Sequence, residues 1–210
     1  MANVKSRVRE NPATKPKADA SAKPQGPIGR EAVLDAAIHQ FSIAGYDGTT
    51  MREIASVSGM LVGSIYYYFS SKEQLFLAAH EHAIEHICAA VRKSIDPAAD
   101  PWTRLTQAAQ GYLESMLNDY EYASIIISEF PRRRADELRD VLISHRQRFE
   151  DLFADIISEI PLRKGVDRSY FRLAVLGMLA WTYTWYNPKG RDSPRVIAKK
   201  MVSMLREANS

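Results

Sequence analysis

Two cations, Arg52 and Lys72, stand where a basic side chain is mildly unfavourable. Each lies in the first turn of an expected helix, where the helix dipole favours an anion. A nucleic-acid phosphate would remove this conflict, because it accepts hydrogen bonds from backbone N–H groups and pairs with a basic side chain. A solvated surface is the commoner place for one Lys or Arg, but two such cations beside one turn favour a phosphate.

The segment that must position these cations has the pattern of a helix-turn-helix. Thr50 and Glu53 form a capping box, which predicts a helix start after Thr50. Met51, Ile54 and Ala55 then recur at helical spacing. Gly59 tolerates the left-handed conformation that ends a helix, so a turn is expected there.

A second short helix is expected over Val62–Tyr68, followed by a long one. Leu61 precedes the short helix and cannot accept an amide hydrogen bond, so the usual cap is missing at a cost of about 1 kcal/mol. The pair Ser70 and Glu73 predicts a further capping box at the start of the long helix.

Three consecutive tyrosines, Tyr66, Tyr67 and Tyr68, cannot all face one side of a helix. We expect one to pack inward and at least one to face solvent or DNA, where tyrosines reach phosphates or thymine methyl groups. The short helix contains no Arg, the commonest reader of guanine, so Arg52 is the best candidate for a guanine contact.

The order of motifs from Arg30 to Phe76 resembles the N-terminal domain of the TetR family of bacterial transcriptional regulators. The resemblance rests on Phe41, Gly45-Tyr46, Thr49-Thr50, Ile54-Ala55, Gly59, Gly63, Ile65-Tyr66, Tyr68-Phe69, Ser71-Lys72-Glu73 and Leu75. It implies double-stranded operator DNA as a partner. The DNA-facing residues that it implies are Thr50, Arg52, Val62, Gly63, Ser64, Tyr66, Tyr67, Tyr68 and Lys72. Leu61 departs from the family pattern, which places a polar residue there.

The predicted fold class is all-α. The resemblance implies a three-helix helix-turn-helix domain followed by a helical ligand-binding and dimerisation domain. The expected divisions are a disordered basic arm over residues 1–27, the DNA-binding domain over 28–75 and the second domain over 76–210. The expected helices are Ile28–Ala44, two within Thr50–Phe69, Ser71–Ile95, one starting at Asp100-Pro101, Tyr120–Phe130, Ala135–Ile160, Asp167–Trp185 and Ser193–Glu207.

Composition is that of an ordinary globular protein, with 46% hydrophobic and 25% charged residues among 210. The single cysteine, Cys88, excludes an intramolecular disulfide. The longest apolar run, Leu173–Trp181, is too short to span a bilayer, and no signal-peptide pattern opens the chain. We therefore expect a cytoplasmic protein with no membrane partner.

Charge is concentrated at the start of the chain. Residues 1–30 carry seven Lys and Arg against two carboxylates, a formal charge of +5, which leaves −2 for the rest. Four prolines and no aromatic residue in 1–27 predict disorder. The arm either follows DNA phosphates or enters a groove, or it is a solubilising tail.

No motif points to catalysis or to a bound cofactor. His82 and His86 have the i, i+4 spacing of a metal pair, but no HExxH or Cys partner accompanies them, so a solvated helix face is the better interpretation and no metal is expected. The sequence lacks a GxSxG elbow, a Walker A loop and a strand-borne GxGxxG. We expect a protein that is not an enzyme.

A run of arginines, beginning with Arg132 and continuing to Arg148, is either a solvated face or an anion site. The stretches ISEFPRRR…LR…HRQRFE and TWYNPKGRDSPRVIA resemble TetR-family members that respond to acyl-CoA thioesters. This resemblance implies an apolar cavity for an acyl chain and cations for phosphates. The expected ligand-binding residues are Tyr112, Met116, Arg132, Arg146, Phe149, Phe153, Trp181 and Trp185, although plain core packing is the commoner role for each aromatic taken singly.

Together these features predict a homodimeric, ligand-responsive repressor that binds a palindromic operator and is released by an apolar or acyl-CoA-type effector. Two alternatives stay open. One is a DNA-binding regulator controlled by a protein partner without a small molecule. The other is a helical enzyme or scaffold in which the helix-turn-helix is vestigial.

Overall fold

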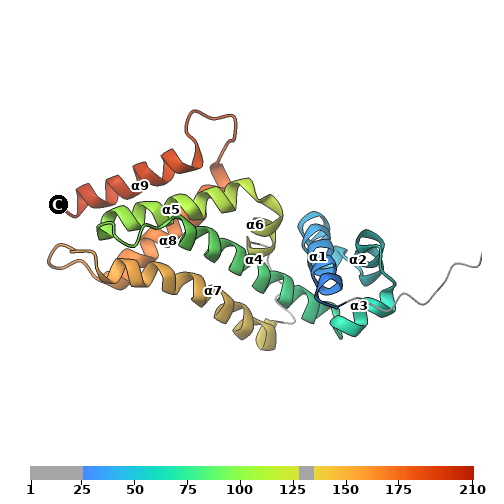
Figure 1. Cartoon of the computed structure of the whole chain (residues 1–210). Helices are drawn as coiled ribbons and strands as arrows, with labels where there is room; N and C mark the ends of the chain where they lie inside the picture. The colour runs from blue at the N-terminus through green and yellow to red at the C-terminus, as the bar shows by residue number, and fades with distance from the viewer. Residues whose placement is uncertain (1–25, 128–134) are drawn as a thin grey trace, which may run out of the picture.

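The computed structural model describes residues 26–127 and 135–210, and over these ranges the chain is helical without strands (Figure 1). This confirms the all-α prediction. The helices are α1 (Gly26–Gly48), α2 (Met51–Ser58), α3 (Val62–Tyr68), α4 (Lys72–Ser94), α5 (Pro101–Asn118), α6 (Tyr120–Ile127), α7 (Ala135–Ser158), α8 (Arg168–Trp185) and α9 (Pro194–Ala208). Most of the expected arm, and Arg132, lie outside the described residues.

The first apolar core lies where α1, α2 and α3 meet the first half of α4. Phe76 of α4 packs edge-on against Phe41 and Tyr46, each 5.2 Å away between ring centroids. The predicted apolar face of α2 is buried in this core. α1 is kinked at Gly45, whose φ of 69° lies in the left-handed region that favours glycine.

The second core surrounds α5, which packs against α4 on one side and α9 on the other (Figure 1). α7 and α8 close its remaining sides. The largest fully buried side chains of this core are Leu105, Leu113, Phe153, Ile157, Ile160 and Leu179. The long helix α4 runs through both cores, so the boundary expected between residues 75 and 76 falls within one helix and stays a prediction.

The short helix α6 belongs to both cores. Ile125 is buried in the first core, whereas Ala123, two residues earlier, is buried in the second. His39 of α1 contacts Glu121 of α6, with 2.7 Å between Nδ1 and Oε1. On the α4 side, the ring of Tyr122 stacks on His86 at 4.2 Å. α6 therefore joins the N-terminal unit to the C-terminal one.

The start of α4 differs from the prediction by one residue. Ser71 caps the helix by accepting a hydrogen bond from the backbone N–H of Gln74, and Ser70 N–H donates to the Gln74 side chain. The predicted box of Ser70 with Glu73 is wrong. Ser70–Glu73 and Ser71–Gln74 have the same spacing, so the local pattern alone could not choose between them.

Candidate DNA-binding surface and ligand-binding core

The first helix of the turn begins with the predicted capping box. Glu53 N–H donates to the Thr50 hydroxyl at 3.3 Å, and Thr50 N–H donates to the Glu53 carboxylate at 2.7 Å. Hydrogen bonds from Thr50 hold the pKa of the Glu53 carboxyl below its usual range. Gly59 ends the helix at φ 67°, as expected. The Thr50 side chain is thus committed to the helix start.

The second helix, α3, has one buried and one exposed face. Ile65 is fully buried, while Tyr67 is 77% and Tyr66 49% exposed. Tyr68 turns inward, where its hydroxyl lies close to Gly29. The expected division of the three tyrosines is therefore confirmed. A side chain at Gly63 would meet nothing within 4 Å, so the outer face of α3 is open.

Lys72 is not the free cation that the sequence suggested. Its ammonium donates to the backbone carbonyls of Tyr46 and Thr49 at 2.8 and 2.9 Å and lies 4.3 Å from the Tyr46 ring centroid. Both carbonyls come after the kink of α1 at Gly45, so the Lys72 cation has hydrogen-bond partners within the protein. The position of Lys72 therefore does not require a phosphate to explain it, and the sequence could not show that these two carbonyls lie beside the start of α4.

Arg52 stands on the exposed side of α2, and within the described residues no ion pair joins it to a carboxylate. Val62 and Ser64 are half-buried. Arg30, near the start of α1, lies 5.1 Å over the ring of Phe69 at the end of α3. The exposed side of α2 and α3 therefore offers one free guanidinium, the two outer tyrosines and Leu61, the exposed residue just before α3.

Four of the expected ligand-binding residues come together in the second core. Tyr112 lies 5.0 Å from Phe149 and 6.4 Å from Phe153 between ring centroids, and Met116 follows one turn along α5. Burial raises the pKa of Tyr112 to about 12. These side chains form an apolar cluster between α5 and α7.

The other described members of the expected ligand set lie elsewhere, so that set is not one site. Trp181 and Trp185 are 66% and 48% exposed on α8. Arg146 is exposed and pairs with Glu150 on its own helix at 3.1 Å. The periodicity of α8, apolar on every side, could not separate its inner from its outer face.

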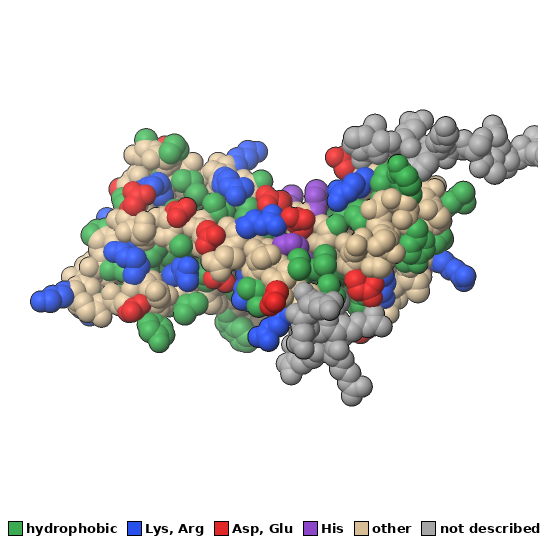
Figure 2. Space-filling view, turned by 90° about the horizontal axis from the view of Figure 1, so that it is seen from below, with side chains coloured by type: hydrophobic (Ala, Val, Ile, Leu, Met, Phe, Trp, Pro, Cys, Tyr) green, Lys and Arg blue, Asp and Glu red, His purple; other side chains and the backbone are tan. Residues whose placement is uncertain are grey.

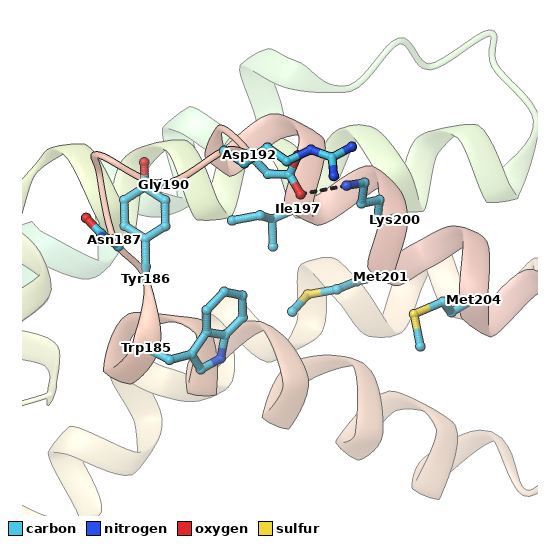
Figure 3. Close-up of a pocket in the computed structure, with 10 residues that line it drawn as sticks. Trp185, Tyr186, Asn187, Gly190, Asp192, Ile197, Lys200, Met201 and Met204 are labelled. Carbon is cyan, nitrogen blue, oxygen red and sulfur yellow. Dashed lines mark hydrogen bonds and ion pairs between the residues drawn. The ribbon is translucent and has the colours of Figure 1, made fainter.

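Trp185 instead lines a surface groove of about 420 Å³ between the end of α8 and α9. Figure 3 shows its indole facing Met201 and Met204 across the groove. At the upper rim, Lys200 donates to Asp192 at 2.6 Å. The groove therefore has an apolar floor, and its rim carries two cations, Arg191 and Lys200, beside the single carboxylate of Asp192.

The histidines gather midway along the molecule, between its two units (Figure 2). His80 and His145 form a buried pair between α4 and α7, with 3.2 Å between their Nδ1 atoms. Sequence reasoning did not pair them, although His145 falls on the apolar stripe of α7. His86 binds Asp119 at 2.9 Å. Among the described residues no group of three His, Cys, Asp or Glu side chains is arranged to hold a metal.

Comparison with known proteins identifies the family to which the chain belongs. Residues 33–79 match the family model described as bacterial regulatory proteins, tetR family. Residues 98–208, more than half of the chain, match the tetracyclin repressor-like C-terminal domain. The chain therefore belongs to the TetR family of bacterial transcriptional regulators, and its helix-turn-helix is a DNA-binding unit.

Individual relatives are similar over most of their length. The HTH-type transcriptional repressor KstR2 of Mycobacterium tuberculosis is 24% identical over 187 residues, covering 84% of this chain and 90% of the relative. The TetR-family regulator PfmR of Thermus thermophilus has 25% identity, a TM-score of 0.65 and coverage of 82% and 96%. AibR, solved with isovaleryl coenzyme A and operator DNA, has 25% identity, a TM-score of 0.67 and coverage of 83% and 96%.

Within 26–127 and 135–210, no helix is both long and apolar enough to cross a bilayer. The matched relatives are regulators of transcription, in agreement with a role other than catalysis.

Proposed function

We propose that this protein is a homodimeric repressor that binds a palindromic operator and leaves it when an acyl-CoA-type effector enters the C-terminal unit. The observation that carries this proposal is α6, whose side chains are shared between the two cores. We also propose that it works in the cytoplasm, because a repressor must reach its operator.

The shared helix α6 offers a physical route from ligand to DNA. Met116 and the aromatic cluster lie in the same core as Ala123, so a ligand that parts α5 from α7 would also press on α6. Ile125 would then shift within the core that positions α2 and α3. Packed cores switch between discrete arrangements, so a small shift can change the angle of a recognition helix. The ligand acts through its different affinity for the two states.

The outer face of α8 supports a homodimer. Tyr170, Leu173 and Trp181 are 75%, 53% and 66% exposed, and the exposed positions between them are alanine or glycine. Such a contiguous, uncharged apolar face is unusual on a monomer and marks an interaction site. Met204, 66% exposed on α9, lines one groove with Trp185 at the end of α8. Two copies joined here by a two-fold axis would present two recognition helices to one palindrome.

The apolar cluster of Tyr112, Met116, Phe149 and Phe153 supports an apolar effector. AibR, of similar fold and 25% identical, was solved with isovaleryl coenzyme A and operator DNA. Opening the cluster around an acyl chain would bury apolar surface at about 25 cal/mol per Å² before ordering costs. The expected cations for the phosphates are Arg132 and Arg146. Arg146 already has a partner on its own helix, so phosphate binding would have to displace Glu150.

The test is operator binding measured with and without ligand. A labelled duplex selected by the protein from a random library would be titrated by fluorescence anisotropy, alone and with a panel of acyl-CoA thioesters. Matched free acids and free CoA serve as controls. We expect one or more thioesters to weaken binding at least tenfold and the acids to act much more weakly, because they lack the phosphates. Equal effects of acid and thioester would refute the CoA component, and no effect from the panel would refute this effector class.

The route through α6 is tested separately with Ile125→Val, which removes one methylene from the shared helix. Operator affinity without effector should stay within a few-fold of wild type, while the effector's weakening of DNA binding should change. An unchanged effector response would contradict the α6 route and leave the effector assignment intact.

A further inference from the structure

Leu61, the residue before α3, is an apolar side chain that contributes little to the folded protein. It is 72% exposed, and it caps α3 without any side-chain hydrogen bond. A serine, threonine or aspartate here would satisfy an amide of the first turn. The free protein thus gains neither a cap nor apolar burial from this leucine, so its use must be sought in the DNA complex.

The composition of α3 restricts what it can read in a major groove. Its residues, Val62–Tyr68, include no Arg, Lys, Asn, Gln, Asp or Glu. The bidentate contacts that identify guanine or adenine are therefore unavailable to this helix. An apolar side chain has one specific partner on the major-groove edge, the C5-methyl group of thymine. Gly63, with open space where a Cβ would lie, lets the backbone come close to the bases.

We propose that Leu61 is a specificity-determining residue that reads the C5-methyl group of one thymine in each operator half-site. This inference rests on the operator binding proposed above. This assignment accounts for the exposed isobutyl group, because contact with the methyl group would cover it. It also accounts for the missing N-cap hydrogen bond, because a polar capping residue could not make that apolar contact. Burying one methyl group corresponds to about fourfold in affinity, from about 0.8 kcal/mol per buried carbon group.

The experiment removes the methyl group from the DNA and the isobutyl group from the protein. In a duplex selected by the wild-type protein, each thymine is replaced in turn by deoxyuridine, which differs only by lacking that methyl. Binding is measured for wild type, Leu61→Ala and Leu61→Ser, the second restoring a capping hydroxyl. Ile143→Ala is the matched control, because Ile143 is also an exposed aliphatic residue, 39% exposed, but lies on α7. Circular dichroism verifies that each variant is folded.

At one thymine per half-site, we expect deoxyuridine to weaken wild type and Ile143→Ala about fourfold. Each Leu61 variant should bind the duplex with that thymine and the duplex with deoxyuridine in its place equally well. The inference is overturned if every deoxyuridine affects Leu61→Ala and Leu61→Ser as much as wild type. If wild type selects no duplex at all, the proposed operator binding fails and this inference fails with it, so the two failures are distinguishable.

Discussion

His80 Nδ1 lies 3.2 Å from His145 Nδ1, and the two imidazoles stack between α4 and α7 with both side chains buried. Because one nitrogen must donate and the other accept, the pair is stable only while at least one ring is neutral. Burial, with a smaller contribution from His145, lowers the pKa of His80 to about 4. Around the pair, Arg148 bridges Glu81 and Glu85 of α4 at 2.7 and 2.9 Å.

The buried pair predicts acid-sensitive stability. In the unfolded chain His80 takes up a proton near pH 6.5, whereas in the folded protein it does so only near pH 4. Stability is therefore complete above about pH 6.5 and falls as the pH drops toward 4, by an amount on the order of 2 to 3 kcal/mol. Urea unfolding at several pH values measures this slope. His80→Gln cannot titrate and should flatten it; an identical slope in that variant would exclude His80 as its source.

Lys72→Ala should reduce both stability and DNA binding. The ammonium makes two charge-assisted hydrogen bonds to the carbonyls of Tyr46 and Thr49, so its loss should cost about 1.5 to 3 kcal/mol in unfolding free energy. One N–H donor is left for a phosphate, and we expect the salt dependence of operator binding to fall by about one unit per half-site. Unchanged DNA binding at matched salt, combined with reduced stability, would limit Lys72 to a structural role.

Replacing Tyr67, unlike replacing Lys72, should weaken DNA binding without reducing stability. Its side chain is 77% exposed, so Tyr67→Ala should change unfolding free energy by less than about 0.5 kcal/mol. Operator binding should nevertheless weaken several-fold if the ring contacts the backbone or a base edge. Tyr67→Phe separates the hydroxyl from the ring. Anisotropy titrations that give wild-type affinity for Tyr67→Ala would remove this residue from the DNA-binding surface.

The dimer face can be tested without disturbing the core. Met201 and Leu205 are half-buried against the second core, so charges there would damage the fold itself. Leu173→Glu with Met204→Glu is cleaner, because both side chains are more than half exposed. Sedimentation should show a dimer for wild type and a folded monomer for this variant, with operator affinity lost. A wild-type monomer at micromolar concentration would refute the assembly.

Helix starts and ends that depend on residues close together in the sequence were predicted well. The Thr50–Glu53 box and the glycine end of α2 depend on residues within one or two turns, and the structure has them as expected. The environment of Lys72 depends on carbonyls 23 and 26 residues away, which no local pattern reveals.

The expected ligand-binding residues proved to lie in separate places, again because their positions depend on contacts between distant parts of the chain. Tyr112 and Trp181 both lie on apolar helices, and only the packing of α5 and α8 decides that one is inside and the other outside. Likewise, the spacing of histidines on α4 gave no indication that His80 would meet a partner 65 residues later. The sequence indicated that these side chains lie on helices, but it did not indicate which residues they contact.

The placement of Ile125 ties the folding of the two units together. The core that holds the helix-turn-helix is completed by a residue some fifty positions further along the chain, from a helix that also contributes Ala123 to the other core. Neither unit can therefore melt without uncovering apolar surface of the other. Heat or denaturant should take the chain apart in one cooperative transition, and a fragment that ends within α4 would lack part of its own interior.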